Sequence, residues 1–429
     1  MDLITHLVKD KKFSGVGRRA PVMNPATGRQ IREVVLGDQT VVDAAVGDAV
    51  ESGREWAKKT PIFRARVMLR YSELIRKNIG SLAKVVSEEH GKTIPDAQGS
   101  ITRGIEVVEF ASGFPSLAKG EYSPQVGTGV NSFNFRQPLG VCAGITPFNF
   151  PAMVPLWMMP VALVCGNAFI LKPSEKDPSC SRKLVELAHE AGVPEATVQM
   201  INGDKEVVDG LLTHTCIDAV SFVGSSPVAQ YIFNEGSKNG KRVQALGGAK
   251  NHLVVMPDSD VATVVDALIG SAFGSAGERC MAISVAVCVG DDTADRTVKR
   301  LVEKAGNLKV GPASDLNSDF GPVNNEGLYK KILDYIDIGV DEGADLIMDG
   351  RSINIPGFES GYFIGATVFD NVSENMKIYQ EEIFGPVLSV VRVQTYEEAI
   401  DLLNKHPLGN GASIFTGDGG VAQHFVENC

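Results

Sequence analysis

The feature that most constrains the fold is a regular alternation of apolar runs and helical stretches that begins near residue 139. Short apolar runs separated by helix-length segments are typical of parallel strands joined by helical crossovers. The pattern therefore predicts an α/β fold, in which a parallel sheet is covered by helices on both faces. The expected strands are 140–145, 168–171, 197–201 and 219–223, and the expected helices lie near 152–164, 179–191, 205–213 and 227–236.

Three further segments flank this pattern. The chain up to residue 112 is expected to be mostly helical, with helices at 41–58, from Pro61 to about Gly80 and at 95–112. Residues 120–138, bounded by prolines and glycines, are expected to be extended, either as an arm or as a crossing between domains. A second α/β series starts at His252, with strands near 252–256, 284–289 and 386–393.

Composition excludes several classes of protein. A net charge of −11 in 429 residues argues against nucleic acid or an anionic membrane as the main partner. The seven cysteines are scattered and form no C-x-x-C pair, which indicates reduced thiols and a cytoplasmic protein. Neither the cysteines nor the histidines show metal-ligand spacing, so no metal site is predicted. The N-terminus lacks a secretory pattern, and the longest apolar stretch, 148–171, contains prolines and is expected to be buried.

A candidate nucleophile stands between small residues and a strand. Cys280 lies in the run Phe273–Ile283, FGSAGERCMAI, where glycines let a substrate carbon approach the thiol closely. Read alone, the same cysteine is explained better by simple packing in the core. The neighbouring segments must therefore decide its role.

Four other segments have the character of ligand contacts. In 145–151, ITPFNFP, Asn149 between two phenylalanines can direct an amide into an apolar pocket, or it can hold its own turn. In 171–175, LKPSE, Lys172 and Glu175 follow a buried strand, where ligands of parallel sheets bind; a solvated loop is the alternative.

The other two segments are equally open. In 222–227, FVGSSP, a strand is followed by Gly224, Ser225 and the start of a helix, which suits a pyrophosphate or is an ordinary helix cap. The carboxylates in 380–386, QEEIFGP, suit a ribose, or form a surface turn.

Together and in this order, these motifs resemble the aldehyde dehydrogenase superfamily. The resemblance runs from Asn24-Pro-Ala-Thr-Gly28 to Leu408-Gly-Asn410. It implies a Rossmann-type NAD-binding domain and an α/β catalytic domain, with a β arm used for oligomerisation into homodimers or homotetramers. The implied limits are 1–119 with 139–246 for NAD binding, 120–138 for the arm and 247–429 for catalysis.

The resemblance also implies a role for each motif residue. Cys280 would attack the aldehyde, and Asn149 with the Cys280 backbone N–H would form the oxyanion hole. The implied NAD-binding residues are Thr146, Phe148, Lys172, Glu175, Gly224, Ser225, Glu382 and Phe384. Lys172 and Glu175 would bind the adenosine ribose and Glu382 the nicotinamide ribose. A carboxylate at Glu175 favours NAD over NADP, because it would repel a 2′-phosphate.

One departure from the superfamily pattern points to a branch. Hydrolytic members carry a general-base glutamate immediately before Leu-Gly-Gly, and this chain has Ala245 there. Alanine cannot take a proton from water, so a better nucleophile, such as the thiol of coenzyme A, is needed to release the acyl group. The alternative activity is that of a hydrolytic NAD-dependent aldehyde dehydrogenase acting on another aldehyde.

Two further strings resemble the CoA-acylating branch that oxidises methylmalonate or malonate semialdehyde. These strings are GAKNH at 248–252 and GERCMA at 277–282. The resemblance implies that Arg103 and Arg279 bind the substrate carboxylate, with Phe150 as a further substrate contact. From the residues alone, Arg103 could be a surface residue and Arg279 could pair with an internal carboxylate. The implied products are propionyl-CoA or acetyl-CoA, NADH and carbon dioxide.

The C-terminus is the second departure. Family members continue beyond the position of Phe415-Thr-Gly417 with a tail that completes the substrate funnel and pairs with a neighbouring subunit, and this sequence ends at Cys429. The tail is therefore expected to be missing, which leaves open oligomer formation and an inactive NAD-binding form.

Overall fold

The computed structural model describes residues 2–11, 13, 15 and 17–429, which form two compact units. The first unit comprises Met1–Met23, Gln30–Glu89 and Ala97–Gly247, and the second comprises Asn24–Arg29, His90–Asp96 and Gly248–Cys429. Each unit is built around its own parallel sheet. No helix in the described part of the chain is long and apolar enough to cross a membrane.

The first unit contains a five-stranded parallel sheet in the order β10-β9-β6-β7-β8. Its strands are β6 (Val141–Ile145), β7 (Ala168–Lys172), β8 (Val198–Met200), β9 (Ala219–Val223) and β10 (Arg242–Leu246). Its helices are α1 (Gln39–Ala57), α2 (Pro61–His90), α3 (Ile94–Ser112), α4 (Phe114–Leu117), α5 (Met153–Val164), α6 (Pro178–Ala191), α7 (Lys205–Thr213) and α8 (Ser226–Lys238), with the first residues of α3 belonging to the second unit.

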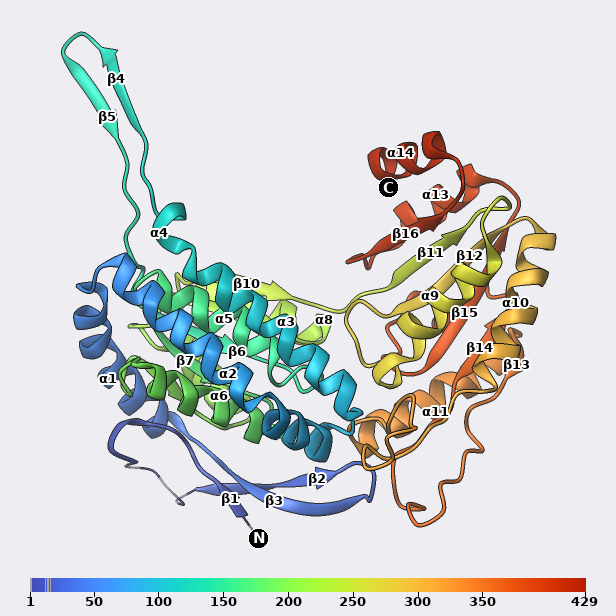
Figure 1. Cartoon of the computed structure of the whole chain (residues 1–429), viewed down its shortest axis with the longest axis horizontal. Coiled ribbons are helices and arrows are strands. Elements are labelled where there is room, and N and C mark those ends of the chain that lie inside the picture. The colour runs from blue at the N-terminus through green and yellow to red at the C-terminus, as the bar shows by residue number, and fades with distance from the viewer. Residues whose placement is uncertain (1, 12, 14, 16) are drawn as a thin grey trace. The chain divides into compact units, whose positions relative to one another are not determined.

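Helices cover both faces of this sheet. Every residue of β6 and β7 is therefore buried. Apolar residues of α1, α7 and α8 form one cluster with β6, β7 and β9. Helices α5 and α6 contact the sheet outside that cluster. The predicted α/β architecture and its strands and helices after residue 139 are therefore confirmed for the first unit (Figure 1).

The N-terminal part is mostly helical, as expected, but it has three strands that were not predicted and one helix that is longer than predicted. The structure has strands β1 (Asp2–Ile4), β2 (Arg18–Asn24) and β3 (Arg29–Leu36), which form a small sheet in the order β1-β3-β2, next to a short 3₁₀ turn, Lys9–Lys11. Helix α2 continues past Gly80 to His90, because a glycine costs a helix only about 0.5–1 kcal/mol. Leu82 and Ala83, which follow that glycine, are buried, so packing offsets this cost.

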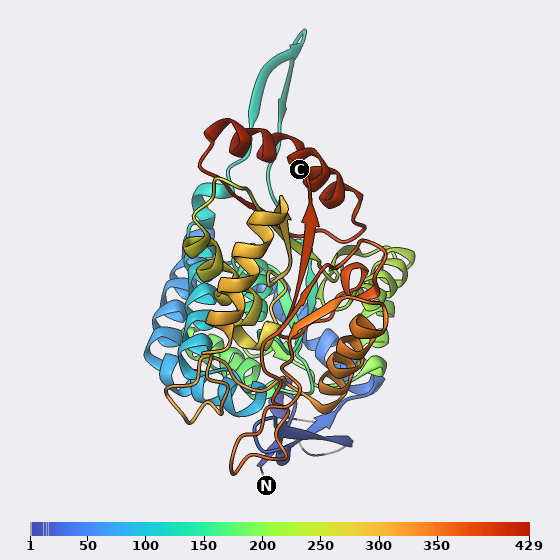
Figure 2. The same ribbon diagram turned by 90° about the vertical axis from the view of Figure 1, so that its right-hand side faces the viewer.

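The expected arm is a β-hairpin of β4 (Tyr122–Gly127) and β5 (Val130–Phe133). Figures 1 and 2 show it extending away from the helices and sheet of the first unit. All of its residues are exposed, including Tyr122, Val126 and Phe133, and the rings of Phe133 and Phe135 stack at 6.3 Å. The hairpin therefore presents a row of apolar side chains to its surroundings.

The second unit contains a six-stranded sheet in the order β13-β14-β15-β12-β11-β16, parallel except at β13. Its strands are β11 (Asn251–Val255), β12 (Ile283–Val289), β13 (Asp345–Met348), β14 (Thr367–Asp370), β15 (Val387–Val393) and β16 (Ala412–Phe415). Its helices are α9 (Val261–Phe273), α10 (Asp291–Ala305), α11 (Glu326–Asp341), α12 (Lys377–Gln380), α13 (Tyr396–Lys405) and α14 (Gly419–Asn428), with a 3₁₀ turn at Gly274–Gly277.

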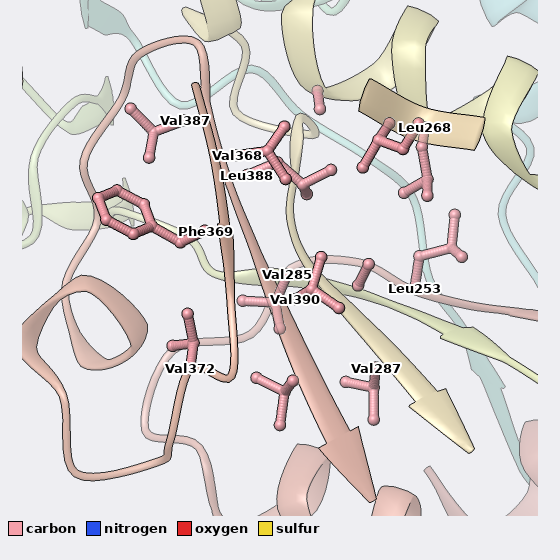
Figure 3. Close-up of a cluster of buried hydrophobic side chains, with 14 of the residues drawn as sticks. Leu253, Leu268, Val285, Val287, Val368, Phe369, Val372, Val387, Leu388 and Val390 are labelled. Carbon is pink, nitrogen blue, oxygen red and sulfur yellow. The ribbon is translucent and has the colours of Figure 1, made fainter. Parts of the chain in front are cut away.

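A large apolar core fixes this sheet. Side chains of neighbouring strands, among them Val285, Val368, Phe369 and Leu388, belong to one buried apolar cluster with residues of α9 such as Leu268 (Figure 3). All of these side chains are fully buried. The loops that follow α9 and precede β15 are therefore attached to a rigid base.

Candidate active site

A pocket of the first unit lies where three neighbouring parallel strands end. It has a volume of about 620 Å³ and is lined by residues that follow β6, β7 and β9. Ligands of open α/β sheets bind beyond the carboxyl ends of the strands, so the location suits a nucleotide. The pocket brings together six residues that the sequence assigned to the cofactor: Thr146, Phe148, Lys172, Glu175, Gly224 and Ser225.

Charged side chains and the N-terminus of a helix line this pocket. The Lys172 ammonium lies 3.3 Å from a Glu175 carboxylate oxygen, so the pocket contains an ion pair of two residues that can donate and accept hydrogen bonds. The Lys176 ammonium stands 5.2 Å above the Phe148 ring. Ser225 occupies the N-cap position of α8 without a side-chain capping hydrogen bond, and the backbone N–H groups and dipole at such a helix N-terminus favour an anion.

Three other predicted residues of the first unit lie outside the lining of this pocket. Asn149 is buried in the turn after β6, and Phe150 packs in a small cluster with Met153 and Val154. Arg103 is exposed on α3 and pairs with Glu106 at 2.6 Å. Their predicted roles in catalysis and substrate binding stay predictions.

In the second unit, a narrow cavity surrounds the candidate nucleophile. Four predicted residues from two loops line it: Arg279, Cys280, Glu382 and Phe384. Cys280 is half-buried in the loop between the 3₁₀ turn and β12. The structure thus places the thiol and the Glu382 carboxylate around one space.

A close backbone contact fixes these two loops against each other. A Cβ atom on Gly277 would collide with the carbonyl oxygen of Gly385, so the position requires glycine. Ser275, Ala276 and Gly277 all have left-handed backbone conformations, with φ of 56°, 52° and 72°. This is a costly turn for the first two residues, and it aims the following residues at the cavity.

Two asparagines hold the backbone of the nucleophile. The side-chain amides of Asn251 and Asn410 each donate a hydrogen bond of 2.9 Å to the Cys280 carbonyl. The Asn251 amide also donates to the carbonyl of Ala282 and accepts from the N–H of Gly411. Asn251 is therefore the junction between the Cys280 loop and the start of β16.

A buried lysine holds the loop that carries Glu382. The Lys250 ammonium donates to the carbonyls of Ile378 and Glu381 at 2.7 and 2.8 Å, and burial lowers its pKa to about 7. The backbone N–H of Ala249 donates to the Glu382 carboxylate at 3.0 Å. The segment before β11 thus fixes both the main chain and the side chain of the loop.

The surroundings of Cys280 keep its thiol protonated at neutral pH. Burial raises the pKa of the thiol, and the Glu382 carboxylate raises it further. The N–H groups of Cys280 and Met281 and the Lys92 ammonium act in the opposite direction. Burial likewise raises the pKa of Glu382, while Ala249, Lys331 and Lys250 lower it. The thiol therefore has to be deprotonated before it attacks.

Arg279, next to the nucleophile, pairs with a carboxylate of the same unit. Its guanidinium lies 2.9 Å from Asp96, in the first turn of α3. This is the internal pairing that the sequence left open as an alternative to a substrate contact.

Sequence reasoning missed several residues that shape the site. Asn251 and Lys250 lie inside the GAKNH string, but their type alone gave no sign of their partners. Asp96 and Asn410 are far from Cys280 in the sequence, and only the fold brings them to its loop.

A family model described as the aldehyde dehydrogenase family matches residues 13–429. The chain belongs to the aldehyde dehydrogenase family. Over 427 residues it is 51% identical to a malonate-semialdehyde dehydrogenase of Pseudomonas aeruginosa, and the match covers 100% of this chain and 86% of that protein. The predicted superfamily is thereby confirmed.

Solved structures agree with this assignment. A methylmalonate-semialdehyde dehydrogenase of Oceanimonas doudoroffii has a TM-score of 0.98 and 49% identity, over 100% of this chain and 88% of that one. A Sinorhizobium meliloti protein solved in complex with NAD has a TM-score of 0.97 and 48% identity, over 100% of this chain and 87% of that one. The aldehyde dehydrogenase fold predicted from the motifs is therefore confirmed.

In this aldehyde dehydrogenase, Glu382→Gln should move the alkylation of Cys280 to lower pH. The carboxylate is negatively charged where the thiol titrates, so its removal stabilises the thiolate and lowers the thiol pKa. The rate of iodoacetamide labelling of Cys280, followed against pH by peptide mass spectrometry, measures the midpoint. A midpoint that stays in place or rises would contradict this electrostatic account.

Gly277→Ala should lower dehydrogenase turnover by about 100-fold, because displacement of the nucleophile by about 1 Å has an effect of that size. The added methyl group meets the Gly385 carbonyl and sits on a left-handed backbone. Gly270→Ala, on α9 with open space around its Cβ position, is the matched control and should leave turnover unchanged. Equal turnover in the two variants would show that the backbone contact does not position Cys280.

Proposed function

We propose that the chain is an NAD-dependent, CoA-acylating dehydrogenase of malonate semialdehyde or methylmalonate semialdehyde. The names of its relatives support this substrate class. The products are acetyl-CoA or propionyl-CoA, together with NADH and carbon dioxide.

One observation carries the CoA-acylating part of the proposal. The position before Leu246-Gly247-Gly248, which holds a general-base glutamate in hydrolytic members, is Ala245, on the edge strand β10. A methyl group cannot accept the proton of an attacking water. Release of the acyl group from Cys280 therefore requires a nucleophile that reacts without a general base, and the thiol of coenzyme A is one.

The chemistry centres on Cys280. Its sulfur, once deprotonated, adds to the aldehyde carbon and gives a thiohemiacetal, whose oxyanion the backbone N–H of Cys280 and the amide of Asn149 are proposed to stabilise. Loss of hydride from that carbon leaves a thioester on the cysteine. The bond between the substrate carboxylate and the carbon next to the thioester carbonyl then breaks, and carbon dioxide leaves. The electrons of that bond move toward the thioester carbonyl, and the carbon that lost the carboxylate takes up a proton. Attack by CoA then restores the free thiol.

NAD, when bound, accepts the hydride. We propose that Lys172 and Glu175 bind its adenosine ribose, Gly224 and Ser225 its pyrophosphate, and Glu382 its nicotinamide ribose. The pocket at the strand ends and the helix N-terminus of α8 support the first two assignments. The cavity that Glu382 shares with Cys280 supports the third, because hydride must leave from the carbon bonded to that sulfur.

The substrate carboxylate is proposed to bind Arg279 and Arg103, with Phe150 as an apolar contact. The assignment is supported best for Arg279, because this residue lines the Cys280 cavity. A guanidinium matches the geometry of a carboxylate and binds it by paired hydrogen bonds.

Domain roles and assembly complete the proposal. Residues 1–119 and 139–246 bind NAD, residues 247–429 carry out catalysis, and the arm, 120–138, joins copies of the chain into a homodimer or homotetramer. The free thiols of all seven cysteines, which lie in the described residues, support a cytoplasmic location.

NADH formation from malonate semialdehyde should depend on added CoA and should be absent in Cys280→Ala. The reason is that only a thiol releases the acyl group efficiently. Absorbance at the NADH band and chromatography of the products measure both. Turnover without CoA that yields a free acid would favour a hydrolytic aldehyde dehydrogenase instead, and no turnover by a folded protein would favour an inactive NAD-binding form.

The paired change Phe133→Ser and Phe135→Ser should reduce self-association, because it removes the two stacked rings from the exposed hairpin. Sedimentation velocity measures the assembly, and Leu316→Ser, at an exposed leucine outside the hairpin, is the control. An unchanged sedimentation coefficient in the paired variant would exclude the arm as the contact.

A further inference from the structure

An ion pair lies beside the nucleophile in the second unit. Arg279 donates from Nη2 to Asp96 Oδ1 at 2.9 Å, and the two side chains are 31% and 18% exposed. Because Arg279 directly precedes Cys280 and lines the same cavity, its charge acts on whatever binds at the thiol.

The surrounding structure holds the guanidinium against Asp96. Gly274 leaves the necessary room, since a Cβ there would stand 2.6 Å from Nη1 of Arg279. The same nitrogen donates a long hydrogen bond of 3.4 Å to the Gly270 carbonyl. The arginine is thus fixed by an acid on one side and a backbone carbonyl on the other.

Asp96 stands at the start of a helix. It lies in the first turn of α3, where the helix dipole stabilises a negative charge. Its second oxygen, Oδ2, is buried and has no hydrogen-bond partner among the described residues. Because the two side chains are in direct contact, a carboxylate that approaches Arg279 also approaches the Asp96 carboxylate.

We propose that Asp96 is a positioning residue that weakens the hold of Arg279 on the substrate carboxylate. This inference rests on the proposed function, in which that carboxylate binds Arg279. The substrate loses its carboxylate during the reaction, so a clamp that bound it at full strength would stabilise the group that must leave. Asp96 keeps the guanidinium oriented and balances part of its charge.

Asp96→Asn separates charge from orientation, because the amide oxygen can still accept the Arg279 hydrogen bond. The KM for malonate semialdehyde should fall by about three- to tenfold, the range expected for one partly exposed charge. The KM for propanal, which has no carboxylate, should not change. Asp96→Ser is a second uncharged variant with the same expected direction, should the first fail to fold.

Two controls make the result specific. Glu109→Gln removes an equal charge from the same helix at an exposed site that pairs with Arg76, and it should leave both KM values unchanged. In an Arg279→Met background, Asp96→Asn should no longer lower the KM for malonate semialdehyde, since Asp96 acts through that arginine.

The outcomes distinguish the inference from the function beneath it. If Arg279→Met alone does not raise the KM for malonate semialdehyde relative to propanal, the proposed carboxylate clamp is wrong. If it does, but Asp96→Asn leaves that KM unchanged or raises it, the clamp stands and the role of Asp96 is overturned. A fall in the KM for both aldehydes would also overturn it, because the effect would not concern the carboxylate.

Discussion

The backbone contact between Gly277 and Gly385 is the constraint on which the thiol site depends. Any side chain at Gly277 would force apart the loop that carries Cys280 and the loop that carries Glu382. The left-handed turn at Ser275 and Ala276 is strained, and the buried core beneath both loops holds it in place. Asn251 and Lys250 then fix the two loops through hydrogen bonds to their carbonyl groups.

The contact between these two loops both positions the Cys280 thiol and keeps it half-buried. Burial and the Glu382 carboxylate raise the pKa of the Cys280 thiol, so the resting cysteine is protonated. Partial burial also suits a thioester on Cys280 that must not react with water before the thiol of coenzyme A attacks it. Ala245 fits this chemistry, because it offers no base to activate water.

The sequence allowed much of the architecture to be predicted, because buried parallel strands such as β6 and β7 are continuous apolar runs. Strands β2 and β3 escaped prediction because they mix charged and apolar residues, which hides the run of apolar residues that marks a buried strand. The site motifs could be located from strand ends and glycines. The pairing of Arg279 with Asp96 could not be predicted, because it joins residues 183 positions apart through the tertiary fold.

The most direct test of this account is a single-turnover experiment with malonate semialdehyde and NAD but no CoA. We expect one equivalent of NADH per active thiol, with an acyl group on the peptide that contains Cys280, detected by mass spectrometry and removed when CoA is added. Continued NADH formation without CoA, with an unmodified Cys280 and a free acid in solution, would contradict the claim that the sheltered thioester waits for a thiol.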